Sequence, residues 1–106
     1  MSSSLTEIEL SNAVSVLINT ETITVELDDG RTISIPLSWY PRLLHGTVDE
    51  RRNYRLVGGG SGIHWPDLDE DISIEGLLAG HRSQESQASL GKWLEKRGQR
   101  KSASSP

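Results

Sequence analysis

The chain has 106 residues, which is enough for one domain with a modest core, since a domain of this length buries roughly two thirds of its unfolded surface. It contains no cysteine, which excludes disulfides, thiolate zinc sites and a cysteine nucleophile. The net charge of -4 conceals an asymmetry, because residues 1–80 carry five Arg and thirteen Asp or Glu, whereas residues 81–106 carry six Lys or Arg and two Glu.

The first third of the chain predicts antiparallel strands. Three segments have strand character: residues 13–18, 22–27 and 32–35. In the second segment, Ile23, Val25 and Leu27 alternate with polar residues, which is typical of a strand with one buried face. Asp29 and Gly30 then supply the positive φ angles of a tight hairpin turn.

Short helices are expected after this sheet. Pro36 ends the last strand because it lacks a backbone donor, and Ser38 is predicted to cap a helix that ends at His45. Thr47 and Glu50 have the spacing of a capping box, in which each side chain accepts from the backbone N–H of the other. A second short helix is therefore predicted after Thr47.

The second half of the chain predicts, in order, strands over 54–57 and 63–65, a helix over 74–79, and a last helix from Ser83 or Ser86 to Arg97. The last helix has a thin apolar face of Leu90, Trp93 and Leu94, so it is stable only if it docks. Residues 98–106 are expected to be a disordered basic tail, which leaves residues 1–97 as one domain. The predicted fold class is α+β: a small antiparallel sheet, short helices on one side, and a C-terminal helix.

The run from Gly58 to Asp71 combines glycines, a His-Trp-Pro triplet and four carboxylates. It is not a P-loop, because no Lys-Ser or Lys-Thr follows the glycines. Its acidic end resembles the opening of an EF-hand, but Ile72 and Leu78 stand where that loop needs Gly and Glu. We therefore predict no metal site. Alternation places the aspartates on one side of an extended segment, where they form a docking surface for a basic partner or a solvated rim.

No spacing predicts catalysis. The histidines are His45, His64 and His81, and they lack the His-x-x-x-His spacing of a helical zinc site. Asp67 could polarise His64, although a structural histidine is the more common outcome of such a pair. No Gly-x-Ser-x-Gly elbow occurs. We therefore expect neither an enzyme nor a cofactor.

Tryptophan and arginine are favoured interface anchors, and Trp39 and Trp65 each lie near a proline. The alternative is that both rings fill the core of a chain without phenylalanine. The predicted partner-binding residues are Trp39, Arg42, Trp65, Asp67, Asp69 and Glu70.

Several stretches together resemble the bacterial domain-of-unknown-function 2442 family: residues 36–43, 50–51, 62–71 and 74–78, with the late Ser89-Leu90-x-x-Trp93-Leu94 helix. The likeness runs from about Ala13 to Arg97. It implies a small α+β domain with a meandering sheet and no assigned catalytic residues. Some relatives carry a helix-turn-helix, and others are encoded beside a second small protein in an arrangement similar to a toxin–antitoxin pair.

These observations favour a non-enzymatic, cytoplasmic protein-interaction domain, with an antitoxin-like role toward a small basic protein as one form of it. The alternative is a nucleic-acid-associated regulator, which would use the basic residues near the C-terminus: Lys92, Lys96, Arg97, Arg100 and Lys101. No apolar run approaches the about 20 residues of a membrane helix, and residues 1–4 lack the features of a signal peptide.

Overall fold

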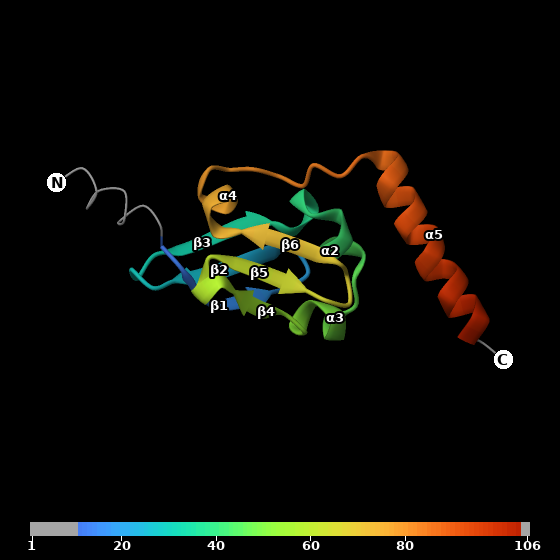
Figure 1. Cartoon of the computed structure of the whole chain (residues 1–106), viewed down its shortest axis with the longest axis horizontal. Helices are drawn as coiled ribbons and strands as arrows, with labels where there is room; N and C mark the ends of the chain where they lie inside the picture. Colours follow the sequence, from blue (N-terminus) through green and yellow to red (C-terminus); the bar gives the residue numbers. More distant parts are fainter. Residues whose placement is uncertain (1–10, 105–106) are drawn as a thin grey trace.

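The computed structural model describes the backbone of residues 11–104, with side chains as far as Gly98. Two three-stranded antiparallel sheets lie one in front of the other (Figure 1). The first sheet has the order β1-β2-β3, with β1 (Ala13–Ile18), β2 (Thr22–Leu27) and β3 (Thr32–Pro36). The second has the order β4-β5-β6, with β4 (Arg55–Val57), β5 (Gly62–Trp65) and β6 (Glu70–Ser73). The α+β fold class predicted from the sequence is confirmed.

The first sheet follows its predicted pattern closely. Ile23, Val25 and Leu27 of β2 are all buried, because the alternation places them on the face that looks toward the second sheet. Gly30 in the β2–β3 turn has a φ of 94°, a conformation that glycine adopts without a steric penalty. Pro36 is the last residue of β3, an edge strand, where a missing backbone donor does little harm.

The second sheet contains one strand that the sequence did not predict. β4 and β5 lie where expected, and the turn between them includes the 3₁₀ helix η2 (Gly58–Gly60). β6 pairs with β5 although it begins with two carboxylates, which are poor strand formers. Gly60 joins the two sheets closely, because a Cβ atom at this position would lie 2.5 Å from the carbonyl oxygen of Ala13.

The helices are the 3₁₀ helix η1 (Leu37–Trp39), α2 (Pro41–His45), α3 (Val48–Arg52), α4 (Ile74–Leu78) and α5 (Gln87–Ser104). The predicted capping box is present at α3: the Glu50 N–H donates to the Thr47 hydroxyl at 3.1 Å, and the Thr47 N–H donates to the Glu50 carboxylate at 2.8 Å. The predicted cap at Ser38 is wrong. The chain forms η1 there, and α2 begins at Pro41, whose missing N–H suits the first turn.

α5 stands at the end of the domain formed by α2 and α3 (Figure 1). It runs to Ser104 and so extends past Arg97, where we expected the chain to leave the helix. The residues that follow Arg97 include Gln, Arg, Lys and Ala, which favour helix, and the next proline is Pro106. The last two residues of the predicted tail, 105–106, lie outside the described part of the chain, and the division into a domain and a tail stays a prediction.

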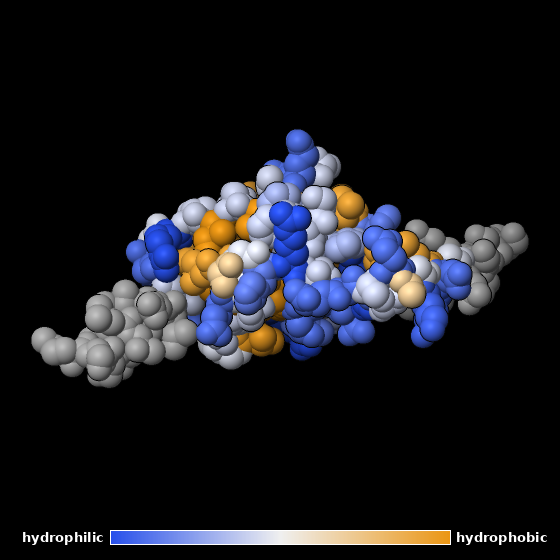
Figure 2. Space-filling model, turned by 90° about the horizontal axis from the view of Figure 1, so that it is seen from above, coloured by the Kyte–Doolittle hydropathy of each residue, from blue (hydrophilic) through white to orange (hydrophobic). Residues whose placement is uncertain are grey.

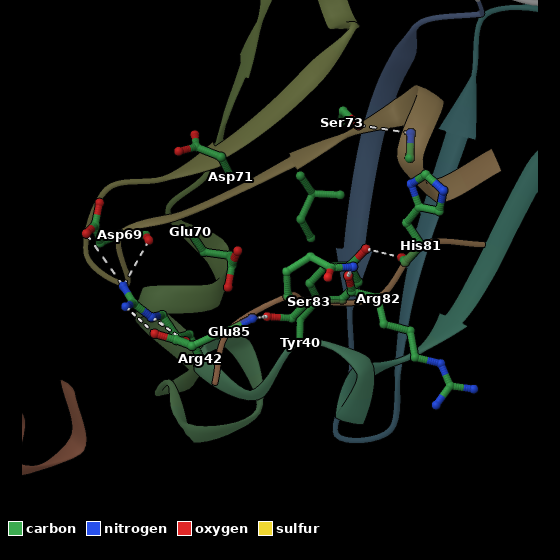
Figure 3. Close-up of a pocket in the computed structure, with 13 residues that line it drawn as sticks. Tyr40, Arg42, Asp69, Glu70, Asp71, Ser73, His81, Arg82, Ser83 and Glu85 are labelled. Carbon is green, nitrogen blue, oxygen red and sulfur yellow. Dashed lines mark hydrogen bonds and ion pairs between the residues drawn. The ribbon is translucent and has the colours of Figure 1, made fainter. Parts of the chain in front are cut away.

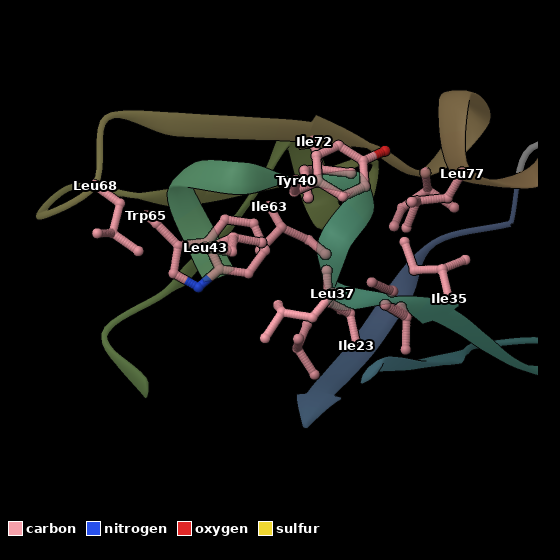
Figure 4. Close-up of a cluster of buried hydrophobic side chains, with 14 of the residues drawn as sticks. Ile23, Ile35, Leu37, Tyr40, Leu43, Ile63, Trp65, Leu68, Ile72 and Leu77 are labelled. Atoms are coloured by element: carbon pink, nitrogen blue, oxygen red, sulfur yellow. The ribbon is translucent and has the colours of Figure 1, made fainter. Parts of the chain in front are cut away.

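Both sheets and the helices η1, α2 and α4 contribute to one core (Figure 4). Trp65 of β5 is its largest fully buried side chain, and Leu43 of α2 and Leu77 of α4 close the core from the helical side. Within the described residues, none of the helices combines the length and the apolar character needed to cross a bilayer.

Candidate functional site

The connection from β5 into β6 displays carboxylates on a well-supported backbone. This acidic turn (residues 66–71) has Leu68 fully buried at its centre, whereas Asp67, Asp69 and Asp71 are exposed. The exposure agrees with the prediction, but the predicted extended segment is wrong, because residues 66–69 form a turn in which Asp69 has a φ of 51°. The side chains of Asp69 and Asp71 are 85% and 74% accessible. Because buried Leu68 anchors the turn, its aspartates face solvent from a defined position.

Arg42 of α2 contacts the backbone of the acidic turn and stabilises it. Its guanidinium donates to the carbonyl oxygen of Asp69 at 3.1 Å and forms a two-pronged pair with Glu85, at 2.8 Å from Nε and 2.5 Å from Nη2. The side chain is only 17% accessible, and the Glu85 carboxylate raises its pKa. Arg42 therefore links α2, the acidic turn and the segment that leads into α5.

A hollow of about 480 Å³ opens beside β6 (Figure 3). This β6 hollow lies between β6, α2 and the chain that follows α4; its lining includes Tyr40, Arg42, Glu70, His81, Arg82 and Glu85. The Tyr40 hydroxyl donates to the His81 carbonyl at 2.8 Å and so ties that chain to the core. Burial, and then the nearby Glu70 carboxylate, raise the pKa of Tyr40.

Glu70 is the half-buried carboxylate of the β6 hollow. Burial raises its pKa to about 7, and the carboxylates of Glu85 and Asp71 add to the effect. Arg42 opposes this shift, but its Nε and Nη2 atoms already donate to Glu85. Glu70 is therefore a carboxyl group that a cation entering the hollow would convert to its ionised form.

This shift predicts a pH-dependent stability. The folded state binds the Glu70 proton more tightly than the unfolded state, whose carboxyl has a pKa of 4.5, so the contribution of Glu70 falls as pH rises from 4.5 to about 7. We expect Glu70→Gln to remove this loss and to stabilise the protein at pH 8 by about 1–2 kcal/mol after allowance for partial exposure. Urea unfolding of the wild-type protein and of Glu70→Gln between pH 4 and 8 measures the difference in the free energy of unfolding.

The matched control for that experiment is Glu75→Gln, which changes an exposed glutamate of α4. It should leave the shape of the stability profile unchanged. Profiles of Glu70→Gln and the wild-type protein that run parallel across this pH range would contradict the expected role of Glu70.

The two tryptophans of the predicted site have different surroundings. Trp65 is inaccessible to solvent, and its indole N–H donates to the Arg51 carbonyl at 3.0 Å. Its assignment as a partner-binding residue is therefore wrong in this fold, and the alternative, a core ring in place of phenylalanine, holds. Trp39 is half-buried and carries the Arg82 guanidinium 4.4 Å from its ring centre, beside the β6 hollow.

The histidine of the motif has a different partner from the one considered above. His64 Nδ1 lies 2.7 Å from Asp71, its cross-strand neighbour, and Asp67 instead accepts from Asn53 at 2.9 Å. Strand pairing explains the difference, because the β5–β6 hairpin places Asp71 directly opposite His64. Among the described residues, no three His, Asp or Glu side chains converge in a way that could hold a metal ion.

Two glutamates of the site pair with arginines that no local spacing predicts. Glu85 pairs with Arg42 and Glu50 pairs with Arg97, across 43 and 47 residues of chain respectively. The capping box predicted one role for Glu50, but no local spacing signals a pair that tertiary packing creates. Of the predicted residues, Arg42, Asp69 and Glu70 meet at the β6 hollow, with Trp39 at its border.

Solved structures share this fold. A crystal structure of a protein of unknown function from Rhodospirillum rubrum is 28% identical, with a TM-score of 0.61, and the match covers 74% of this chain and 94% of that chain. A solution NMR structure of an uncharacterised protein from Chromobacterium violaceum, 24% identical with a TM-score of 0.63, matches over 89% of this chain and 83% of that chain. No curated protein matches the chain.

A family model matches residues 13–83, from the start of β1 to the chain beside the β6 hollow. The match is shorter than the likeness described above, which extended to Arg97, and it leaves α5 outside. It includes both sheets, the acidic turn and all short helices, well over half of the chain. The chain therefore belongs to the family described as Protein of unknown function (DUF2442).

Proposed function

We propose that this protein is a non-catalytic interaction domain that binds a basic protein partner at the acidic turn and the β6 hollow. The observation that carries the proposal is the outward display of Asp69 and Asp71 at the border of a hollow that contains Glu70. Arg42 and buried Leu68 support the turn, so little conformational entropy is lost when a partner binds.

The charge of the body suits such a partner. Residues 1–80 carry thirteen acidic and five basic side chains, which would steer a basic protein toward the domain and repel a phosphate backbone. An antitoxin-like pairing with a small basic neighbour is the more specific form of the same proposal. Nucleic-acid binding through the C-terminal segment draws less support, because Arg97 is engaged by Glu50.

Affinity capture with a charge-reversed turn tests the proposal. We expect the wild-type protein to retain a stoichiometric basic protein from extracts of its native host, and Asp67→Lys/Asp69→Lys/Asp71→Lys to lose most of it. Reversal of three exposed charges at a docking surface removes steering and places like charges opposite each other. Quantitative mass spectrometry of the retained proteins measures the loss, and the purified pair should dissociate as salt rises.

The matched control reverses three exposed glutamates elsewhere, Glu21→Lys/Glu26→Lys/Glu75→Lys, so both variants change the net charge equally. Retention of the same protein by the acidic-turn variant would reject the site. Failure to retain any stoichiometric protein would count against an interaction domain.

A further inference from the structure

Within the side chains described, Arg97 and Trp93 make the main contacts of α5 with the rest of the domain. Arg97 forms a two-pronged pair with Glu50 of α3, at 3.0 and 2.8 Å, and both side chains are largely shielded from solvent. The Trp93 ring packs against the core cluster, and two guanidiniums lie over it, with Arg42 at 5.0 Å and Arg97 at 4.7 Å from the ring centre. Cation–π contacts and one shielded ion pair therefore supply much of the attachment.

This attachment has little apolar area behind it. Leu90, Trp93 and Leu94 are half-buried, so none of the three reaches the full burial seen in the core. A helix that buries so little has to offset its own ordering cost with few contacts. Docked and undocked forms of α5 should therefore differ by only a small free energy.

α5 also brings positive charge to the acidic surface. A second hollow of about 480 Å³, the α5 hollow, separates the helix from the body; Arg42, Asp69, Lys92, Trp93 and Lys96 contribute to its lining. Asp69 belongs to both this hollow and the β6 hollow, so the surface under α5 continues into the acidic turn. The basic helix α5 therefore packs beside the proposed docking surface of the same chain.

We infer that α5 is an internal competitor: it occupies the surface on which a basic helix of the partner docks, and it must leave before that helix binds. The partner helix would present an aromatic ring and an arginine one turn apart, as Trp93 and Arg97 do, to Arg42 and Glu50. The identity of the competing ligand rests on the proposed function. The inference that α5 can leave its seat, the surface formed by Arg42 and Glu50, does not.

Because α5 is part of the same chain, it competes with a free helix at a high effective concentration. Its effective concentration is in the millimolar range for a short linker, so a free helix with the same contacts binds weakly until the tethered copy is released. The apparent affinity of a free helix is reduced by the fraction of molecules in which the seat is open. Release of α5 should therefore raise the affinity for a basic helix without any change in the body of the domain.

The test uses the full chain and a synthetic, fluorophore-labelled peptide with the sequence of residues 86–104. A release variant, Trp93→Ala/Arg97→Glu, weakens the α5 contacts in the tethered copy and leaves Glu50 and Arg42 intact. We expect the peptide to bind the release variant about tenfold or more tightly than the wild-type chain. Fluorescence anisotropy measures both affinities, and circular dichroism melts verify that each protein is folded.

Two controls make the result specific. A peptide with Arg97→Glu should lose binding to the release variant. A receptor that combines the release variant with Glu50→Gln should also bind poorly, although glutamine preserves the capping box of α3. Equal affinities for wild-type and release variant, or no binding to either, would overturn the inference. Because no partner protein enters this test, its outcome is separable from that of the capture experiment.

Discussion

Replacing Trp65 with alanine is expected to destabilise the protein by about 3–5 kcal/mol, the range for removal of a large aromatic side chain from a core. The Trp65 side chain is inaccessible to solvent, and Tyr54 packs at 6.4 Å between ring centres. The substitution would leave a cavity between the sheets and would also strip the Arg51 carbonyl of its indole donor. Urea or thermal unfolding, followed by circular dichroism, measures the loss.

Trp39→Ala is the matched control, because it removes the same side chain from a half-buried position beside Arg82. It should cost about 1–2 kcal/mol, in proportion to the smaller buried area. Equal losses for the two variants would contradict the assignment of Trp65 to the core. A Trp65 variant of full stability would revive the prediction that this ring serves a partner.

Replacing Arg42 with alanine is expected to cost about 2–4 kcal/mol, because it leaves the shielded Glu85 carboxylate without its cation. The substitution also removes a donor to the Asp69 carbonyl and the guanidinium beside Trp93, so the acidic turn and α5 should both loosen. Chemical unfolding measures the stability. Amide hydrogen exchange in the acidic turn and in the first turns of α5 should be faster in the Arg42→Ala variant than in the wild-type protein. The exchange rates of β2 should change less.

Arg42→Lys should retain only part of this stability, since an ammonium cannot reproduce the two-pronged bond to Glu85. Arg52→Ala, at an exposed arginine of α3, should change stability by no more than about 0.5 kcal/mol. If Arg42→Ala were as mild as Arg52→Ala, the pair with Glu85 would not support the acidic turn, and the proposed docking surface would lose its rigid base.

Local patterns in the chain were sufficient for much of the fold. The period of two in Ile23, Val25 and Leu27 predicts the buried face of β2, and the spacing of Thr47 and Glu50 predicts the start of α3. Both signals are local, because side-chain direction alternates along a strand and a capping box spans one turn. The aspartates Asp67, Asp69 and Asp71 are exposed as predicted, but the reason differs, because residues 66–69 form a turn and Asp69 has a φ of 51°.

Packing between distant segments accounts for the features that the sequence did not reveal. Strand β6 exists because β5 offers it a partner, although its own carboxylates disfavour a strand. The same pairing places Asp71, not Asp67, beside His64. Trp65 shows why a motif cannot separate an interface ring from a core ring: the neighbouring residues are the same, and burial depends on the opposite sheet.

The candidate site illustrates both sources of information. The order of the residues is enough to establish an acidic body and a basic C-terminal segment. The seat of α5 depends on Glu50 and Arg97, which lie 47 residues apart, and the ionisation of Glu70 depends on the hollow around it. Contacts of this kind arise when elements pack in three dimensions, so no spacing along the chain encodes them.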